Sequence, residues 1–218
     1  MAAFVTRLKK QVPNDFIDDI DLRLLFSNMS SNALRLALKR AVDGGYLITL
    51  KKGFYLWTED HRRRSLSKFA LANKLYSPSY ISFESALSYH GLIPEAVYTV
   101  TSAHKARKTN TYTTPIGVFS YQYIPDFSLG LGISYEKTVD GNHFLIASAA
   151  KALFDLIYVS RKTYSSLRQL EDDLRIDTNE LSDQMHDVTP DDIDHLVSAY
   201  RKKTTASLGQ LLKKELLK

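Results

Sequence analysis

The chain has 218 residues, of which 44% are hydrophobic and 24% are charged, and its formal net charge is +5. That hydrophobic share is typical of folded globular proteins and argues against wholesale disorder. Because the chain has no cysteine, disulfides, thiolate catalysis, zinc fingers and cysteine-held clusters are excluded.

The charged residues are unevenly distributed along the chain. Residues 61–75 carry a net charge of +5 and residues 201–218 carry another +5, whereas residues 161–200 carry −6. Basic clusters of this kind predict an anionic partner. The alternative, that each cluster is a solvated helix face, stays open at this point.

No segment has the pattern of a signal peptide or of a membrane-spanning helix. Residues 1–12 contain Arg7, Lys9 and Lys10 with no apolar core behind them. The most apolar stretch, 145–159, contains a lysine and an aspartate and is shorter than the ~20 apolar residues that a spanning helix needs. We therefore expect a soluble, cytoplasmic protein with no membrane partner.

Residues 1–60 are predicted to begin with three helices. Apolar periodicity over residues 4–12 predicts the first helix, and a second is expected over residues 19–26. Ser30 or Ser31 can cap a third helix, which Gly44-Gly45 ends.

A β-hairpin is predicted directly after the third helix. Two β-prone runs, 46–50 and 54–57, are joined by the short basic turn Lys51-Lys52-Gly53. Three helices followed by a hairpin is the order of a winged helix-turn-helix domain, which we expect over residues 1–60.

The third helix carries the residues that indicate DNA binding. Asn32, Arg35 and Lys39 follow a spacing of i, i+3, i+7 and so share one face. Arginine can bind guanine bidentately, asparagine can do the same for adenine, and lysine can hold a phosphate. The predicted DNA-binding residues are Ser31, Asn32, Arg35, Lys39, Arg40, Lys51 and Lys52. The alternative is a solvated polar face on a core helix.

Residues 61–75 are expected to form a basic helix that connects two domains. Arg62, Arg63 and Arg64 would stay in solvent there, either contacting phosphates or serving as a solvated helix start. Basic charge opposes the helix dipole at that end, so a compensating partner is expected.

Residues 76–218 change to an α+β pattern that ends in helices. Strands are predicted over 80–81, 97–101, 109–114, 116–124 and 133–139, and helices over 83–90, 148–159, 165–174, 180–186, 191–203 and 207–217. The fold class we expect is therefore α+β: the winged helix-turn-helix, then an α+β domain with a small mixed or antiparallel sheet and a helical C-terminal part.

A second basic surface is the interpretation we favour for the remaining cations. Its predicted members are Arg62, Arg63, Arg64, Lys202, Lys203, Lys213 and Lys214. The competing interpretation is that the C-terminal cations pair with the acidic stretch inside the protein.

Residues suited to catalysis or metal binding are few. His186 and His195 lie among aspartates, but helix-start carboxylates and exposed histidines account for this pattern better than a metal site does. Glu84, Ser85 and His90 fall on one short helix without an oxyanion site or a third member. We expect no enzyme, no metal and no cofactor.

Four sequence blocks, in order, resemble a known family. The first block is Gly45-Tyr46-Leu47 with Lys51-Lys52-Gly53-Phe54-Tyr55-Leu56, and the second is residues 79–94 with the core Ser82-Phe83-Glu84-Ser85-Ala86-Leu87. The third is Val97–Thr101 with Lys105–Lys108 and Gly117-Val118-Phe119. The fourth is residues 146–156 with Lys151-Ala152-Leu153-Phe154-Asp155. Together they resemble AbiEi-type antitoxins of type IV toxin–antitoxin systems over roughly residues 5–160.

The resemblance implies a function. Such proteins are similar in using an N-terminal winged helix to bind and repress their own operator DNA, while the C-terminal domain counteracts a nucleotidyltransferase-type toxin, typically without a stable complex and often in abortive infection against phage. Two other hypotheses remain: a solitary winged-helix transcriptional regulator whose second domain senses a ligand or dimerises, and a DNA-processing enzyme that uses the acidic helices.

Overall fold

The computed structural model describes residues 2–94, 97–125 and 131–217, so Met1 and Lys218, the outer ends of the predicted domains, lie outside it. Its helices and strands form a mixed α+β fold, as the sequence predicts at that coarse level. The chain divides into two compact units, residues 1–66 with 112–117, and residues 67–111 with 118–218. No helix of the described residues is long and apolar enough to cross a lipid bilayer.

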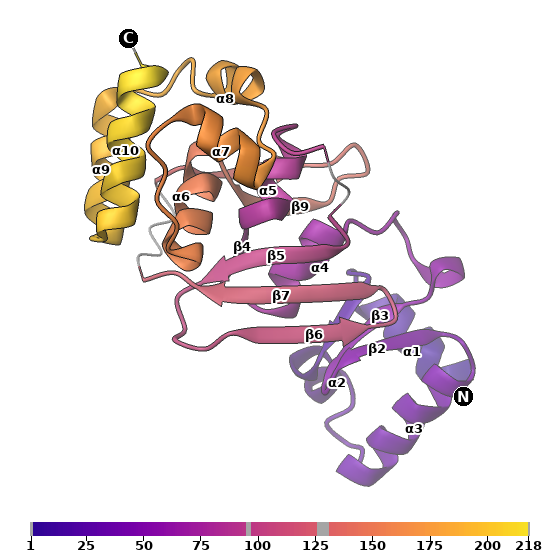
Figure 1. The fold of residues 1–218 in the computed structure, drawn as a ribbon. Coiled ribbons are helices and arrows are strands. Elements are labelled where there is room, and N and C mark those ends of the chain that lie inside the picture. Colours follow the sequence, from indigo (N-terminus) through magenta and orange to yellow (C-terminus); the bar gives the residue numbers. More distant parts are fainter. Residues whose placement is uncertain (1, 95–96, 126–130, 218) are drawn as a thin grey trace. The chain divides into compact units, whose positions relative to one another are not determined.

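The first unit combines three helices with a three-stranded sheet (Figure 1). Its elements are α1 (Ala2–Gln11), β1 (Phe16–Asp18), α2 (Asp19–Leu25), α3 (Ser31–Asp43), β2 (Leu47–Lys51) and β3 (Phe54–Trp57). The strand order is β1-β3-β2, with both pairings antiparallel. The three helices and the hairpin lie where the sequence predicts them, whereas the three-residue strand β1 was not predicted.

Local capping explains where the helices of this unit begin. The Asp18 carboxylate accepts hydrogen bonds from the backbone N–H groups of Ile20 and Asp21, which completes a capping box at the start of α2. The Ser30 hydroxyl accepts one from the N–H of Ala33 at the start of α3. Gly45 follows α3 with a positive φ of 74°, a conformation that favours glycine.

The core of the first unit fixes the orientation of α3. Leu38 and Ala41 are buried on its inner face. They belong to one apolar cluster, which draws on all three helices and the sheet: Val5, Leu8, Val12, Ile17, Leu22, Phe26, Leu38, Ala41, Leu47 and Trp57. The opposite face of α3 therefore points to solvent.

The predicted helix over residues 61–75 is wrong in its first half. The chain forms a short 3₁₀ turn, Glu59–His61, and the next helix, α4, begins only at Lys68. Two causes are visible, one long-range and one local. The Asp15 carboxylate accepts hydrogen bonds from the backbone N–H groups of Arg63 and Arg64, and the Ser67 hydroxyl caps α4.

The second unit is built on a six-stranded mixed sheet of order β6-β7-β5-β4-β9-β8, of which the β6–β7 turn region, residues 112–117, is grouped with the first unit. Its strands are β4 (Tyr80–Ile81), β5 (Thr99–His104), β6 (Asn110–Thr114), β7 (Gly117–Tyr123), β8 (Ile133–Lys137) and β9 (His143–Ala147). β5 pairs in parallel with β7, and β4 pairs in parallel with β9. The sequence left open whether this sheet is mixed or antiparallel, and the structure has a mixed sheet. The strand β9 was not predicted.

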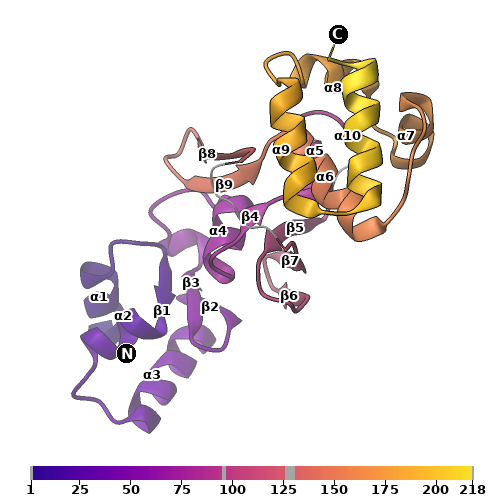
Figure 2. The same ribbon diagram turned by 90° about the vertical axis from the view of Figure 1, so that its left-hand side faces the viewer.

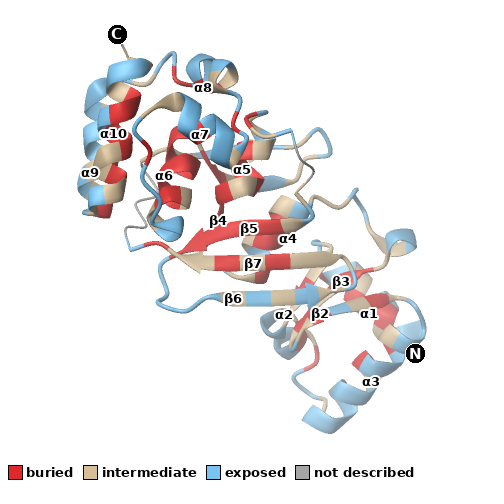
Figure 3. Ribbon diagram, viewed as in Figure 1, coloured by how far each residue is buried: buried red, intermediate tan, exposed pale blue. Residues whose placement is uncertain are grey.

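Helices cover this sheet and form the C-terminal part. They are α4 (Lys68–Leu75), α5 (Phe83–Tyr89), α6 (Ala149–Ser160), α7 (Leu167–Leu174), α8 (Thr178–Gln184), α9 (Pro190–Tyr200) and α10 (Lys203–Glu215). α4 packs on β4, β5 and β9, and α6 contacts α5, α9 and α10. Figure 2 shows α9 and α10 side by side, and Figure 3 shows that the most deeply buried helix is α6.

Candidate nucleic-acid interface

The predicted DNA-binding side chains of α3 lie on its solvent face. Ser31, Asn32, Arg35, Lys39 and Arg40 are all exposed. Within the described part of the chain, none of the three cations forms an ion pair with a carboxylate. The helix therefore offers amide and cationic groups that are outside any ion pair of the described residues, although Asp43 lies near Arg35 and Lys39 on the same helix.

A hollow of about 230 Å³ lies beside this face, between α3 and the hairpin. Arg35 and Lys39 line it from the helix, and Thr49 and Tyr55 line it from β2 and β3. Burial, followed by the charge of Asp19, raises the pKa of Tyr55 above its ordinary value. No sequence signal marks Thr49 or Tyr55 as site residues, because they join the helix only through the strand pairing.

The tip of the hairpin has a tighter structure than the sequence suggests. Gly53 has a φ of 75°, and a Cβ at that position would lie 2.6 Å from Oδ1 of Asp19. Only glycine fits this turn without displacing the carboxylate. The tip is therefore held against the start of α2.

The two lysines of this turn differ in their surroundings. Lys51 is half-buried with its Nζ 5.8 Å from the centre of the Phe54 ring, and burial lowers its pKa. Lys52 is exposed. Of the two predicted contacts at the hairpin tip, Lys52 has the freer access to an anionic partner.

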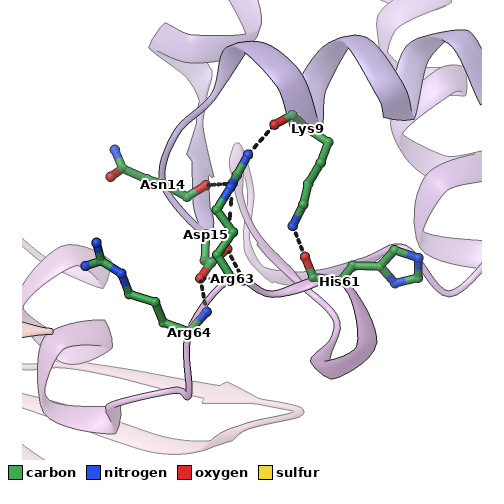
Figure 4. A network of polar contacts seen from close by, with 6 residues as sticks. All are labelled: Lys9, Asn14, Asp15, His61, Arg63 and Arg64. Carbon is green, nitrogen blue, oxygen red and sulfur yellow. Dashed lines mark hydrogen bonds and ion pairs between the residues drawn. The ribbon is translucent and has the colours of Figure 1, made fainter. Parts of the chain in front are cut away.

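The arginines after the hairpin are tied to the first unit. The Arg63 guanidinium donates hydrogen bonds to the carbonyl oxygens of Lys9 and Asn14 and lies 3.8 Å from the Asp15 carboxylate (Figure 4). The Lys9 ammonium donates in turn to the carbonyl oxygen of His61. These contacts give Arg63 a structural role that its place in a basic run did not predict.

Arg62 and Arg64 lie on either side of this contact. The Arg62 side chain is 10% exposed and 3.9 Å from the Glu59 carboxylate. The Arg64 side chain is exposed. Arg63 and Arg64 are both exposed, as predicted for all three arginines, whereas Arg62 is not.

Several C-terminal cations contact groups inside the second unit. Lys202 Nζ lies 3.2 Å from the carbonyl oxygen of Tyr158 and 3.7 Å from the centre of its ring, and burial lowers its pKa. Lys213 Nζ lies 2.5 Å from Oδ1 of Asp194, and Lys214 Nζ lies 3.1 Å from Glu215. Lys203 is exposed. For Lys213, this geometry agrees with internal pairing, the alternative to a second basic surface.

Two of the residues considered for catalysis, Ser85 and His90, contact the backbone. Ser85 Oγ accepts a hydrogen bond from the Thr101 N–H, and His90 Nε2 lies 2.8 Å from the carbonyl oxygen of Ala147. Among residues 2–94, 97–125 and 131–217, no three histidine, aspartate or glutamate side chains gather as metal ligands.

No protein-family model matches the chain, and no curated protein matches it with significant similarity.

Proposed function

We propose that the first unit is a winged helix-turn-helix that binds duplex DNA, with α3 as the recognition helix and the β2–β3 hairpin as the wing. One observation carries this proposal: α3 presents Asn32, Arg35 and Lys39 to solvent beside a hairpin with a basic tip. A helix of this composition suits the major groove, where side chains distinguish bases by their hydrogen-bonding edges.

We further propose that the whole chain is an antitoxin that represses its own operon and counteracts a nucleotidyltransferase-type toxin. The four sequence blocks that resemble AbiEi-type antitoxins support this. Two of them coincide with α5 and α6, which pack against each other in the second unit. Among their polar residues, Ser85, Lys151 and Asp155 are buried and His90 contacts the carbonyl oxygen of Ala147, which suits a fold signature better than a catalytic site.

The DNA-binding part is tested by selecting duplexes from a random-sequence library with the full chain and measuring affinity by fluorescence anisotropy. The triple variant N32A/R35A/K39A should lose the preference for the selected duplex, since a good bidentate base contact contributes about 1–3 kcal/mol of discrimination. The matched control is Q11A/R7A/K10A on α1, which likewise removes one side-chain amide, one arginine and one lysine from exposed positions.

If the α3 variant folds and keeps its preference, α3 is not the recognition helix. The antitoxin part is tested separately: the proposal expects a nucleotidyltransferase gene beside the gene for this chain, and the two are co-expressed and scored for growth. Rescue supports the antitoxin proposal. DNA binding without rescue favours the solitary winged-helix regulator instead.

A further inference from the structure

The second unit carries a basic loop that is separate in sequence from α3 and the hairpin. It joins β5 to β6 and carries Lys105, Arg107 and Lys108, all of them exposed. Among the described residues none of the three forms an ion pair. The sequence from Val97 to Pro125 contains no aspartate or glutamate, so β5, β6, β7 and their connections carry no carboxylate side chain.

The base of this loop is anchored. His104, the last residue of β5, is 1% exposed and packs against Tyr76 and Tyr121, with ring centres 4.7 and 6.4 Å away. Its Nδ1 accepts a hydrogen bond from the Ala106 N–H at 3.3 Å, and its carbonyl oxygen accepts one from Ile124 at 2.9 Å. The three cations therefore begin from a fixed position and not from a flexible tail.

The composition of the loop limits the chemical class of partner that it can bind. The run Lys105-Ala106-Arg107-Lys108-Thr109 has no aromatic side chain on which an unpaired base could stack and no large apolar side chain that could enter a membrane. Cations with a small hydroxyl residue suit phosphate groups, whose contacts position a protein on nucleic acid without reading sequence.

We propose that the β5–β6 loop is a second DNA contact, which binds backbone phosphates of a duplex through Lys105, Arg107 and Lys108. The choice of duplex DNA rests on the proposed function of the first unit. Because both units belong to one chain, a duplex held by one unit is present at high effective concentration for the other. The loop should therefore raise affinity for all sequences equally, while α3 determines preference among them.

The test uses the full chain and a fluorescently labelled 40-base-pair duplex of random sequence, titrated at several salt concentrations. The variant K105S/R107S/K108S should reduce affinity about 10- to 100-fold at 0.1 M salt. It should also flatten the slope of log K against log salt by about 2 to 3, because each phosphate that the protein neutralises contributes roughly 0.9 to that slope. The matched control, K74S/K137S/R168S, removes the same charges from other exposed positions of the second unit and should leave the slope within about one.

The outcomes separate this inference from the proposed function. If the loop variant keeps the wild-type slope while N32A/R35A/K39A loses sequence preference, the loop inference is wrong and the winged-helix proposal stands. If the loop variant loses affinity while the α3 variant binds normally, the winged-helix proposal is wrong and the loop inference stands. An equal loss of affinity in the loop variant and the control would mean that the loop acts only through the net charge of the protein, and it would overturn the inference. Loss of binding to phosphatidylserine vesicles, with unchanged DNA binding, would assign the loop to a lipid surface and overturn it as well.

Discussion

The Nζ atom of Lys151 lies 3.0 Å from Oδ1 of Asp155, one turn further along α6, and both side chains are buried. The Asp155 carboxylate also accepts hydrogen bonds from the hydroxyls of Tyr80 and Ser82, at 2.9 and 2.5 Å, and from that of Tyr200. One buried carboxylate thus connects α6 with β4, with the start of α5 and with the end of α9. The ion pair organises the second unit around α6.

Removing one member of this pair should be costly. Lys151→Met leaves the Asp155 charge buried without its cation, and such a change typically lowers the free energy of unfolding by about 3–5 kcal/mol. The measurement is urea denaturation followed by circular dichroism. Arg168→Met serves as the control, because Arg168 and Asp172 form an exposed pair at 3.9 Å that should contribute about 0–1 kcal/mol. Equal losses in the two variants would contradict the structural role of Lys151.

The buried His104 should make stability depend on pH. Burial lowers its pKa below the ordinary value of 6.5, although nearby backbone hydrogen bonds oppose this. Its unfolded form therefore binds more protons than its folded form in the window below pH 6.5. Stability contributed by the neutral ring is present above that pH and is lost as pH falls through the folded-state pKa, at up to about 1.4 kcal/mol per pH unit.

Urea unfolding at pH 7, 6 and 5 should show this loss in the wild type and a smaller one in His104→Gln. The other five histidines are common to both proteins, so the difference between the two pH profiles isolates His104. Parallel profiles would mean that the buried ring takes up its proton as readily as the unfolded chain does.

The contacts of Arg63 predict a change in stability and not in DNA binding. Arg63→Met removes the bonds to the Lys9 and Asn14 carbonyl oxygens and the ion pair with Asp15. We expect a decrease of about 1 kcal/mol in the free energy of unfolding, since the side chain is one-third exposed and solvent weakens the ion pair. Duplex affinity should match that of Lys10→Met, an exposed α1 control. If Arg63→Met binds DNA more weakly and Lys10→Met does not, Arg63 belongs to a phosphate-binding surface after all.

Short-range signals predicted much of the fold. Thr189 and Pro190 start α9 as their sequence indicates, with Asp192 completing a capping box. Gly44-Gly45 ends α3 and the run 46–57 forms the hairpin, because capping and turn preferences depend on only a few neighbouring residues.

Long-range contacts account for what the sequence did not predict. Residues 61–67 are not helical because Asp15, about fifty positions earlier, binds the backbone of Arg63 and Arg64. β9 forms a local hairpin with β8, which the sequence did not predict, whereas its parallel pair with β4, Ile81 with Ile146, joins positions far apart in the sequence. For the candidate site, helical spacing predicted the exposed face of α3, whereas the partners of Arg63 and Lys202 required the tertiary fold.

The close packing of α9 and α10 depends on Gly209. A Cβ at this position would lie 2.5 Å from Cγ2 of Val197 and 3.2 Å from Cγ2 of Ile193. In an exposed helix, Gly→Ala stabilises by about 1 kcal/mol because alanine has the higher helix propensity. Here overpacking should reverse the sign, so that Gly209→Ala lowers the free energy of unfolding by about 1–3 kcal/mol.

The double variant G209A/V197A tests the cause, because shortening Val197 makes room for the new methyl group. In a double-mutant cycle measured by urea denaturation, the two changes should cost less together than the sum of the single changes, with a coupling of about 0.5–3 kcal/mol. Gln210→Ala, at an exposed position of the same helix, should change stability by less than about 0.5 kcal/mol. A Gly209→Ala variant that is more stable than the wild type would contradict this prediction and show that α10 can move away from α9 at little cost.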